Sequence, residues 1–159
     1  MGDRIKHNRK VLLFLISTLT ILIWGCSLPK IIILKDPLTP EEHLNLGLAY
    51  EQKGEYDLAI REYESASKFI TISYLYLGNA YFQKSEYDKA EASYRKAIRK
   101  DPGLADAYNN LAWLLYSQNK GLDEARSLAL QAIFLNPEGK APYLDTLKRI
   151  EDCKAGNID

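Results

Sequence analysis

The sequence predicts an all-α protein in which pairs of antiparallel helices repeat along the chain and stack into a solenoid. Eight residues of one segment recur 31 positions later in the next. They are Gly47, Ala49, Tyr50, Tyr56, Asp57, Ala59, Tyr63 and Ala66, which return as Gly78, Ala80, Tyr81, Tyr87, Asp88, Ala90, Tyr94 and Ala97. Gly47 and Tyr50, and then Tyr56, Ala59, Tyr63 and Ala66, are three or four residues apart, which places each set on one face of a helix. Self-similarity at such a period is typical of helical solenoids.

Residues 1–25 have the layout of a secretory signal peptide. Four basic residues, Arg4, Lys6, Arg9 and Lys10, precede a largely apolar stretch over residues 11–24. These 14 residues would extend about 21 Å as a helix, at about 1.5 Å per residue, whereas the hydrocarbon core of a bilayer is about 30 Å thick. The stretch therefore favours a signal peptide over a permanent membrane span.

The residues that follow the apolar stretch resemble the lipobox of bacterial lipoproteins. Ile23, Trp24, Gly25 and Cys26 supply an aliphatic residue, a tolerant position, a small residue and the cysteine, although Trp24 is larger than the residue usual at its place. The resemblance implies that the Cys26 thiol carries the lipid, with fatty-acyl chains such as palmitate, and that Ser27 directs the protein to the outer membrane, facing the periplasm. The alternative is an uncleaved anchor in the inner membrane that carries a periplasmic adaptor.

Charge divides the chain into two parts. Residues 1–25 hold four basic residues and one acidic residue, a net charge of +3, so residues 26–159 carry −3 because the whole chain is neutral. A weakly acidic remainder lacks the basic surface that phosphate contacts need, which argues against nucleic acid as a partner. Residues 26–38 are predicted to be a tether, and its apolar run over 31–34 is expected to pack on the first helix of the solenoid; the alternative is that this run lies near the lipid surface.

Two helical hairpins follow, over residues 39–70 and 71–104. The first begins with Thr39, Pro40 and Glu42, which together predict a capping box with proline at the first helical position. Breaks at residues 53–55 and 84–86 separate the helices of each hairpin. The first copy lacks the Asp-Pro loop that closes the second, so its period is three residues shorter and a tighter turn before Thr71 is expected.

A third hairpin spans residues 105–139, with one residue inserted between its helices near Gly121. Ala129 stands where the two earlier copies have tyrosine, so this repeat is expected to pack less tightly. Residues 140–159 are predicted to form a single capping helix and a tail, with Tyr143 and Leu147 covering the third repeat. Exposed solenoid ends need such a cap.

The three copies resemble the tetratricopeptide repeat (TPR), which places a large residue, Leu-Gly, Tyr, Ala, an aromatic, Ala and a final Pro at fixed positions. The second copy carries the pattern as Tyr74, Leu77, Gly78, Tyr81, Ala90, Tyr94, Ala97 and Pro102. The first has His43, Leu46, Gly47, Tyr50, Ala59, Tyr63 and Ala66, and the third has Tyr108, Leu111, Ala112, Leu115, Ala125, Ala132 and Pro137. The resemblance covers residues 39–153 and implies a right-handed superhelix that binds a protein or peptide on its concave side.

Carried onto this sequence, the family's groove positions are Leu44, Leu48, Glu51, Leu75, Asn79, Phe82, Asn109, Trp113 and Tyr116. This set is apolar and aromatic, with two amides. It lacks the Lys and Arg constellation by which chaperone-binding relatives hold a terminal carboxylate. An extended or helical apolar segment is therefore the expected ligand, although Trp113 is equally well explained as core between repeats.

The sequence argues against an enzyme. Its two histidines are His7, in the signal segment, and His43, at a packing position of the repeat. It contains no metal-binding motif, no phosphate-binding loop and no nucleophile paired with a base, so neither a metal nor a cofactor is expected. Cys26 and Cys153 lie too far apart in the chain to indicate a disulfide framework. The interpretation is a non-catalytic scaffold, lipid-anchored in the bacterial cell envelope; an accessory subunit of an envelope hydrolase or peptidase is the alternative from another class.

Overall fold

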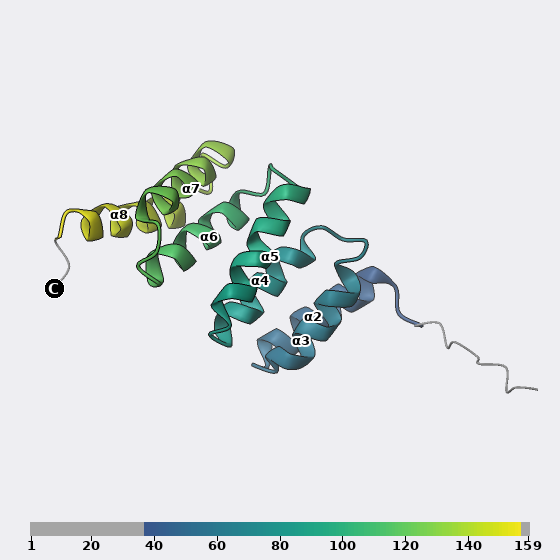
Figure 1. Ribbon diagram of the computed structural model, residues 1–159. Coiled ribbons are helices and arrows are strands. Elements are labelled where there is room, and N and C mark those ends of the chain that lie inside the picture. The colour runs from purple at the N-terminus through teal and green to yellow at the C-terminus, as the bar shows by residue number, and fades with distance from the viewer. Residues whose placement is uncertain (1–36, 157–159) are drawn as a thin grey trace, which may run out of the picture. The chain divides into compact units, whose positions relative to one another are not determined.

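The computed structural model describes residues 37–156, which form seven helices and no strand. The predicted signal peptide over 1–25, Cys26 and the tether up to residue 36 lie outside the described residues. The helices, labelled in Figure 1, are α2 (Pro40–Gln52), α3 (Tyr56–Ala66), α4 (Ser73–Gln83), α5 (Tyr87–Lys100), α6 (Ala105–Ser117), α7 (Leu122–Leu135) and α8 (Ala141–Lys154).

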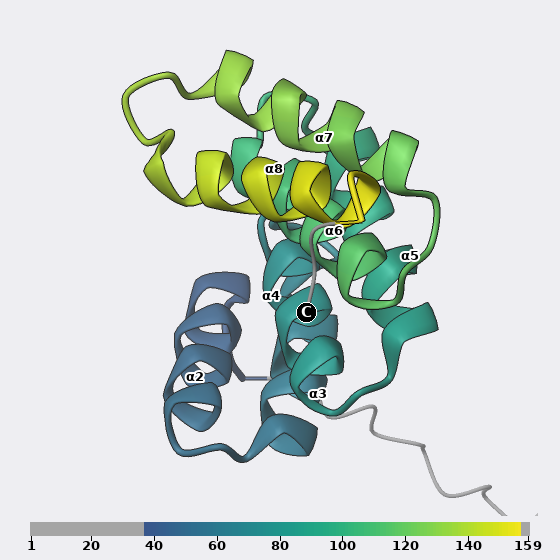
Figure 2. The same ribbon diagram turned by 90° about the vertical axis from the view of Figure 1, so that its left-hand side faces the viewer.

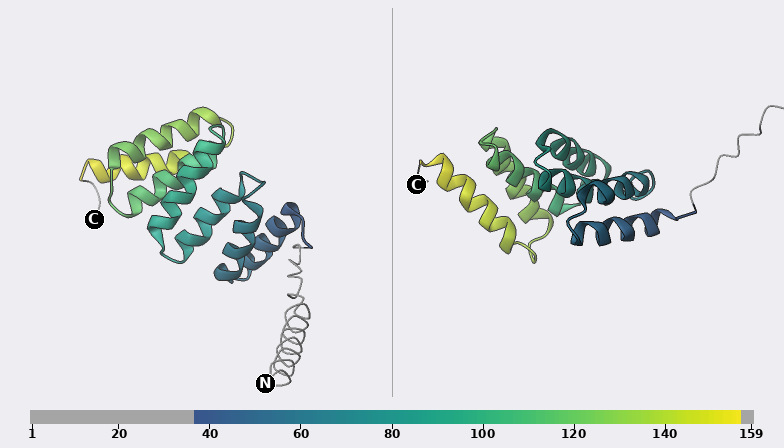
Figure 3. Two further views of the ribbon diagram at one scale, coloured as in Figure 1. Left: turned by 45° about the vertical axis from the view of Figure 1, so that its right-hand side comes forward. Right: turned by 90° about the horizontal axis from the view of Figure 1, so that it is seen from below.

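The helices form three antiparallel hairpins that stack in the order of the sequence. α2 packs against α3, α4 against α5 and α6 against α7, and each hairpin also contacts the next through α3 and α4 or α5 and α6. Figure 1 shows the hairpins following one another, and the two views of Figure 3 show the same order. The helix α8 packs on α7 and α6 at the end of the stack (Figure 2). The predicted all-α solenoid of three helical hairpins with a capping helix is confirmed.

The start of α2 carries the predicted capping box. The backbone N–H of Glu42 donates to Thr39 Oγ1 at 3.2 Å, and the backbone N–H of Thr39 donates to Glu42 Oε2 at 2.7 Å. The hydrogen bond from the Thr39 backbone holds the pKa of the Glu42 carboxyl below its usual value. Pro40 occupies the first turn, where its missing N–H has no helical partner to lose.

The turn within each hairpin has a residue with positive φ shortly after the first helix ends. These residues are Gly54, Ser85 and Asn119, with φ of 74°, 60° and 48°. Each donates its N–H to the carbonyl oxygen three residues earlier. The second helix begins two residues after Gly54 and Ser85 but three residues after Asn119, because Gly121, with φ of 52°, is added. The inserted residue predicted between the helices of the third hairpin is confirmed.

Replacing Ser85 by glycine should raise the free energy of unfolding by about 1 kcal/mol. A residue with a Cβ atom is strained in the left-handed region, whereas glycine is not. Urea unfolding monitored by circular dichroism would measure the gain. Asn119→Gly is the matched control, and it should change stability less because asparagine tolerates this conformation. A larger gain at Asn119 than at Ser85 would contradict the explanation.

The shorter first repeat does not have the tighter turn that its sequence suggested. α3 has 11 residues and α5 has 14, so α3 ends at Ala66 whereas α5 continues past the equivalent Ala97. The connection from α3 to α4 covers residues 67–72, and that from α5 to α6 covers only 101–104. The prediction was wrong because the missing residues are taken from the end of the helix, while the connection is closed by successive short-range backbone hydrogen bonds.

In each hairpin, a small residue on the first helix is paired with a residue of complementary size on the second helix. A Cβ atom on Gly47 would collide with the Tyr63 ring, and one on Gly78 would collide with the Tyr94 ring. In the third hairpin the corresponding residues are Ala112 and Ala129, both fully buried. α6 and α7 contact each other as extensively as the earlier pairs. The expected looser packing is therefore wrong, because the larger residue on α6 replaces the volume lost on α7.

The capping helix α8 covers the third repeat with one face. Tyr143 and Ile150 are buried, and Leu147 packs against the main core cluster. Lys148 and Arg149 are exposed. Within residues 37–156, none of the helices combines the length and the apolar character needed to cross a membrane.

Candidate functional site

A pocket of about 250 Å³ opens where the three hairpins meet, and we call it the groove pocket. Its lining residues come from α2, α4, α5 and α6. They are Glu51, Asn79, Phe82, Gln83, Tyr94, Asn110 and Trp113. The stacking of hairpins brings these residues together from positions up to 62 residues apart in the sequence. The pocket therefore exists only in the assembled solenoid.

Hydrogen bonds between hairpins fix the polar side chains of the groove pocket. Asn79 Oδ1 accepts from Tyr94 Oη at 2.9 Å and from Asn110 Nδ2 at 2.9 Å. The bond to Asn110 connects the second hairpin to the third, and it leaves Asn79 Nδ2 as a donor and Asn110 Oδ1 as an acceptor. Buried or half-buried amides held in this way are preorganised to bond a peptide backbone.

Glu51 is held by the first hairpin. Its Oε2 accepts a hydrogen bond from the hydroxyl of Tyr63, the buried aromatic residue of α3. Tyr63 is the equivalent in the first hairpin of Tyr94 in the second. Its hydroxyl bonds to Glu51 because the residue equivalent to Asn79 is Leu48, which offers no acceptor. The carboxylate is half-buried and its second oxygen, Oε1, is left for another donor.

Burial raises the pKa of both buried tyrosines. For Tyr63 the hydrogen bond to Glu51 adds to the effect, and for Tyr94 the negative charge of Glu51 does so. The charge of Glu51 therefore raises the pKa of a tyrosine in the second hairpin as well as of one in the first. Both hydroxyls remain protonated donors at neutral pH.

This arrangement predicts a loss of stability in alkali. Because the folded state keeps these two phenols protonated above their ordinary pKa of 10.0, unfolding releases protons there and stability falls as the pH rises. In the double variant Tyr63→Phe with Tyr94→Phe, the free energy of unfolding should depend less steeply on pH above 10. Urea titrations at several pH values would measure this slope. Tyr56→Phe, at a half-buried tyrosine, is the control. An unchanged slope in the double variant would refute the prediction.

Four of the nine predicted groove residues line the groove pocket, namely Glu51, Asn79, Phe82 and Trp113. Tyr116 lies beside it, with its ring centroid 5.5 Å from that of Trp113. The half-buried Leu44 and Leu48 pack against a core cluster that the first and second hairpins share.

The remaining two predicted residues lie elsewhere. Leu75 is only 5% exposed and belongs to the main core, so it does not offer an open surface. Asn109 is half-buried, and its Oδ1 is buried without a hydrogen-bond partner in the described part of the chain. Asn109 holds the repeat position of Leu75, 34 residues earlier, which places it between hairpins rather than in the groove pocket.

Sequence reasoning missed three lining residues. Asn110 lies one position beyond the predicted Asn109, and its amide turns toward Asn79. Tyr94 was assigned only to packing, but its hydroxyl passes the edge of Gly78 and reaches the groove. Gln83 is an exposed residue at the end of α4. The repeat gave no signal for Asn110, because its equivalent 34 residues earlier is Tyr76 and that of Asn79 is Trp113.

The rest of the described chain offers structural explanations for its reactive groups. His43 is buried and its Nδ1 lies 2.7 Å from Glu62 Oε2, consistent with a packing role. Cys153 is half-buried in α8. Within residues 37–156, no group of three or more His, Cys, Asp or Glu side chains is placed to hold a metal ion.

Stacked helical hairpins with a pocket on the face of their first helices define a helical-repeat protein. Sequence comparison identifies the repeat: a family model described as TPR repeat matches residues 78–119, and one described as tetratricopeptide repeat matches residues 43–69. The two matched segments are similar to tetratricopeptide repeats, and the described part of the chain has the fold of a TPR solenoid. No curated protein sequence matches this chain.

Solved structures share the fold. The first TPR of Spaghetti (RPAP3), bound to the HSP90 peptide SRMEEVD, is 21% identical with a TM-score of 0.68, and the match covers 77% of this chain and 98% of that one. The TPR2B domain of yeast Sti1, in a complex with pHsp70, is 20% identical with a TM-score of 0.68, covering 72% and 97%. The first TPR domain of human RPAP3 is 22% identical with a TM-score of 0.67, covering 74% and 96%. These identities establish the fold alone.

Proposed function

We propose that the repeat domain is a non-catalytic scaffold that binds a segment of a partner protein in the groove pocket. The observation that carries the proposal is the set of polar groups fixed within the second hairpin and between it and the third, with Asn79 bonded to Tyr94 and Asn110. Domains of the same fold bind peptides, as the complexes of RPAP3 and Sti1 do, which suggests a protein-interaction scaffold. Phe82 and Trp113 supply aromatic surface beside these polar groups, as protein-binding sites commonly do.

The partner of this chain should differ from the peptides bound by those relatives. The HSP90 peptide in the RPAP3 complex ends in the acidic sequence EEVD. The lining of the groove pocket contains neither lysine nor arginine, and it contains Glu51. An acidic segment would be repelled there, so the chemistry of this groove selects against it.

Crosslinking in intact cells tests the scaffold proposal. A photoreactive amino acid in place of Gln83, which is exposed and lines the groove pocket, should capture the partner, whereas the same group in place of Glu138, in the exposed connection between α7 and α8, should not. The capture should be lost when Asn79→Ala and Trp113→Ala are combined. Undiminished capture in that double variant would contradict binding in the groove and would favour the accessory subunit of a hydrolase or peptidase.

We further propose that the protein is a lipoprotein of the bacterial cell envelope, anchored through Cys26 and facing the periplasm from the outer membrane. The order of basic segment, apolar stretch, small residue and cysteine in residues 1–26 supports this proposal. Several acyl chains hold a protein firmly on a membrane, whereas a single chain gives only marginal binding.

Mass spectrometry of the mature N-terminus tests the anchor. We expect a peptide that begins at acylated Cys26, and Cys26→Ser should leave the precursor uncleaved and unlabelled by radioactive palmitate. An intact Met1 in the wild-type protein would instead support the inner-membrane anchor. Separation of the two membranes by density would show which of them holds the lipidated form.

A further inference from the structure

Glu51 is the one charged residue among the seven that line the groove pocket. Tyr63 holds one carboxylate oxygen, and within residues 37–156 the carboxylate forms no ion pair. The helix that carries Glu51 has no basic residue in its last turn. A fixed negative charge therefore faces the groove pocket without a partner of opposite sign.

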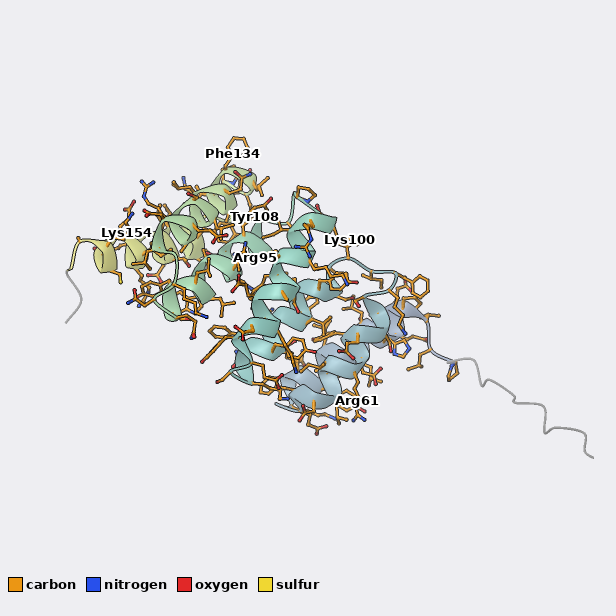
Figure 4. The ribbon with its side chains drawn as sticks, viewed as in Figure 1. Arg61, Arg95, Lys100, Tyr108, Phe134 and Lys154 are labelled. Carbon is orange, nitrogen blue, oxygen red and sulfur yellow. The ribbon has the colours of Figure 1, made fainter. Side chains whose placement is uncertain are left out.

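Two cations of the second hairpin, Lys84 and Arg95, are paired with carboxylates other than Glu51. Lys84 lies 2.6 Å from Asp57 and 2.5 Å from Glu86. The two guanidinium contacts of Arg95 are with Glu91 at 2.8 Å and Glu124 at 2.7 Å. Figure 4 shows Arg95 among the side chains of the middle of the stack. Such paired cations leave the charge of Glu51 uncompensated.

Aromatic rings complete the walls of the groove pocket. Trp113 and Phe82 both line it, and rings of this kind attract cations over their faces. The guanidinium carbon of Arg149, from α8, lies 5.6 Å from the centroid of the Trp113 ring. The indole thus already lies near one guanidinium group, which also forms an ion pair with Asp145 at 2.8 Å.

We propose that the groove pocket binds an arginine side chain of the partner segment, with its guanidinium on the free oxygen of Glu51. This inference rests on the proposed scaffold function and names the residue that the scaffold recognises. The free Oδ1 of Asn110 gives a second acceptor, while Phe82 and Trp113 face the planar group. Arginine is favoured over lysine because its five donors and flat shape match acceptors and rings together.

Peptide binding to the full-length protein in detergent tests the inference. The probes are fluorescein-labelled, blocked nonapeptides of alanine, serine and leucine that differ only at the central residue, which is arginine, lysine, citrulline or glutamate. Fluorescence anisotropy should show the arginine peptide binding at least about tenfold more tightly than the citrulline peptide, because citrulline keeps the shape and loses the charge. The preference should weaken as salt is added.

Glu51→Gln is the informative variant, because glutamine can still accept the hydrogen bond from Tyr63. It should reduce the arginine preference to less than about twofold, while Glu138→Gln, at an exposed carboxylate outside the groove pocket, should retain it. Thermal unfolding by circular dichroism should show both variants folded.

Two results would overturn the arginine inference. Equal affinities for the arginine and citrulline peptides, both lost in Trp113→Ala, would leave the groove as a binding site without a charge preference. Failure of every probe to bind, with partner capture from position 83 intact, would also overturn it and leave the scaffold function standing. If partner capture from position 83 did not exceed capture from position 138, the scaffold function itself would be contradicted.

Discussion

Replacing Gly78 by alanine should lower the free energy of unfolding by about 1–3 kcal/mol, the cost typical of an overpacked core. The added Cβ atom would overlap the Tyr94 ring, which is buried and held by its bond to Asn79. Neither the ring nor the helix backbone can move away without breaking other contacts. Urea unfolding of the purified protein, followed by circular dichroism, would measure the loss.

The companion variant makes this explanation specific. Tyr94→Ala alone should cost about 3–5 kcal/mol, as for other large buried aromatic residues. In the Tyr94→Ala background, however, Gly78→Ala should be neutral or stabilising, because alanine favours a helix over glycine by up to about 1 kcal/mol. The third hairpin contains this same pair of alanines at positions 112 and 129. Additive effects of the two substitutions would show that the ring and the glycine are not in conflict.

Replacing Ile150 by alanine should destabilise the protein by about 2–5 kcal/mol. Ile150 is 0% exposed and belongs to the main core cluster, although it lies on the last helix of the described chain. Its loss would leave a cavity between α8 and the third hairpin. Thermal and urea unfolding would both record the change.

Leu144→Ala on the same helix is the matched control. Leu144 is 45% exposed, so its truncation should cost far less than that of Ile150. Equal effects at the two positions would mean that α8 contributes through its helical structure alone and not through the side chains that cover the repeat.

The hairpins could be predicted from the sequence because their contacts repeat. The glycine and tyrosine pairs, the positive-φ residue of each turn and the capping box at Thr39 are all local features with a fixed spacing. Two expectations failed where one change compensates another: α3 ends early instead of tightening its turn, and Ala112 fills space that Ala129 leaves. Such compensation depends on two residues at once, which a position-by-position comparison does not detect.

The structure brings only some of the predicted groove residues together in one pocket, and the reason lies in the packing between hairpins. The family register names Glu51, Asn79, Phe82 and Trp113, and these four residues line the groove pocket. It treated Leu75 and Asn109 as lining, whereas neighbouring hairpins bury that position, and the adjacent Asn110 turns toward Asn79 instead. The rotation of one helix against the next is set by tertiary contacts, so the sequence alone does not determine it.

Because each helix packs mainly on its immediate neighbours along the chain, the solenoid should fold quickly. Among residues 37–156, the side-chain hydrogen bond with the greatest separation joins Tyr143 to Asp106, 37 residues earlier. Closing loops of this size has a small entropic cost, and proteins dominated by local contacts fold within microseconds to milliseconds. Nucleation can begin at any hairpin and then propagate along the array, so no single long-range contact need form first.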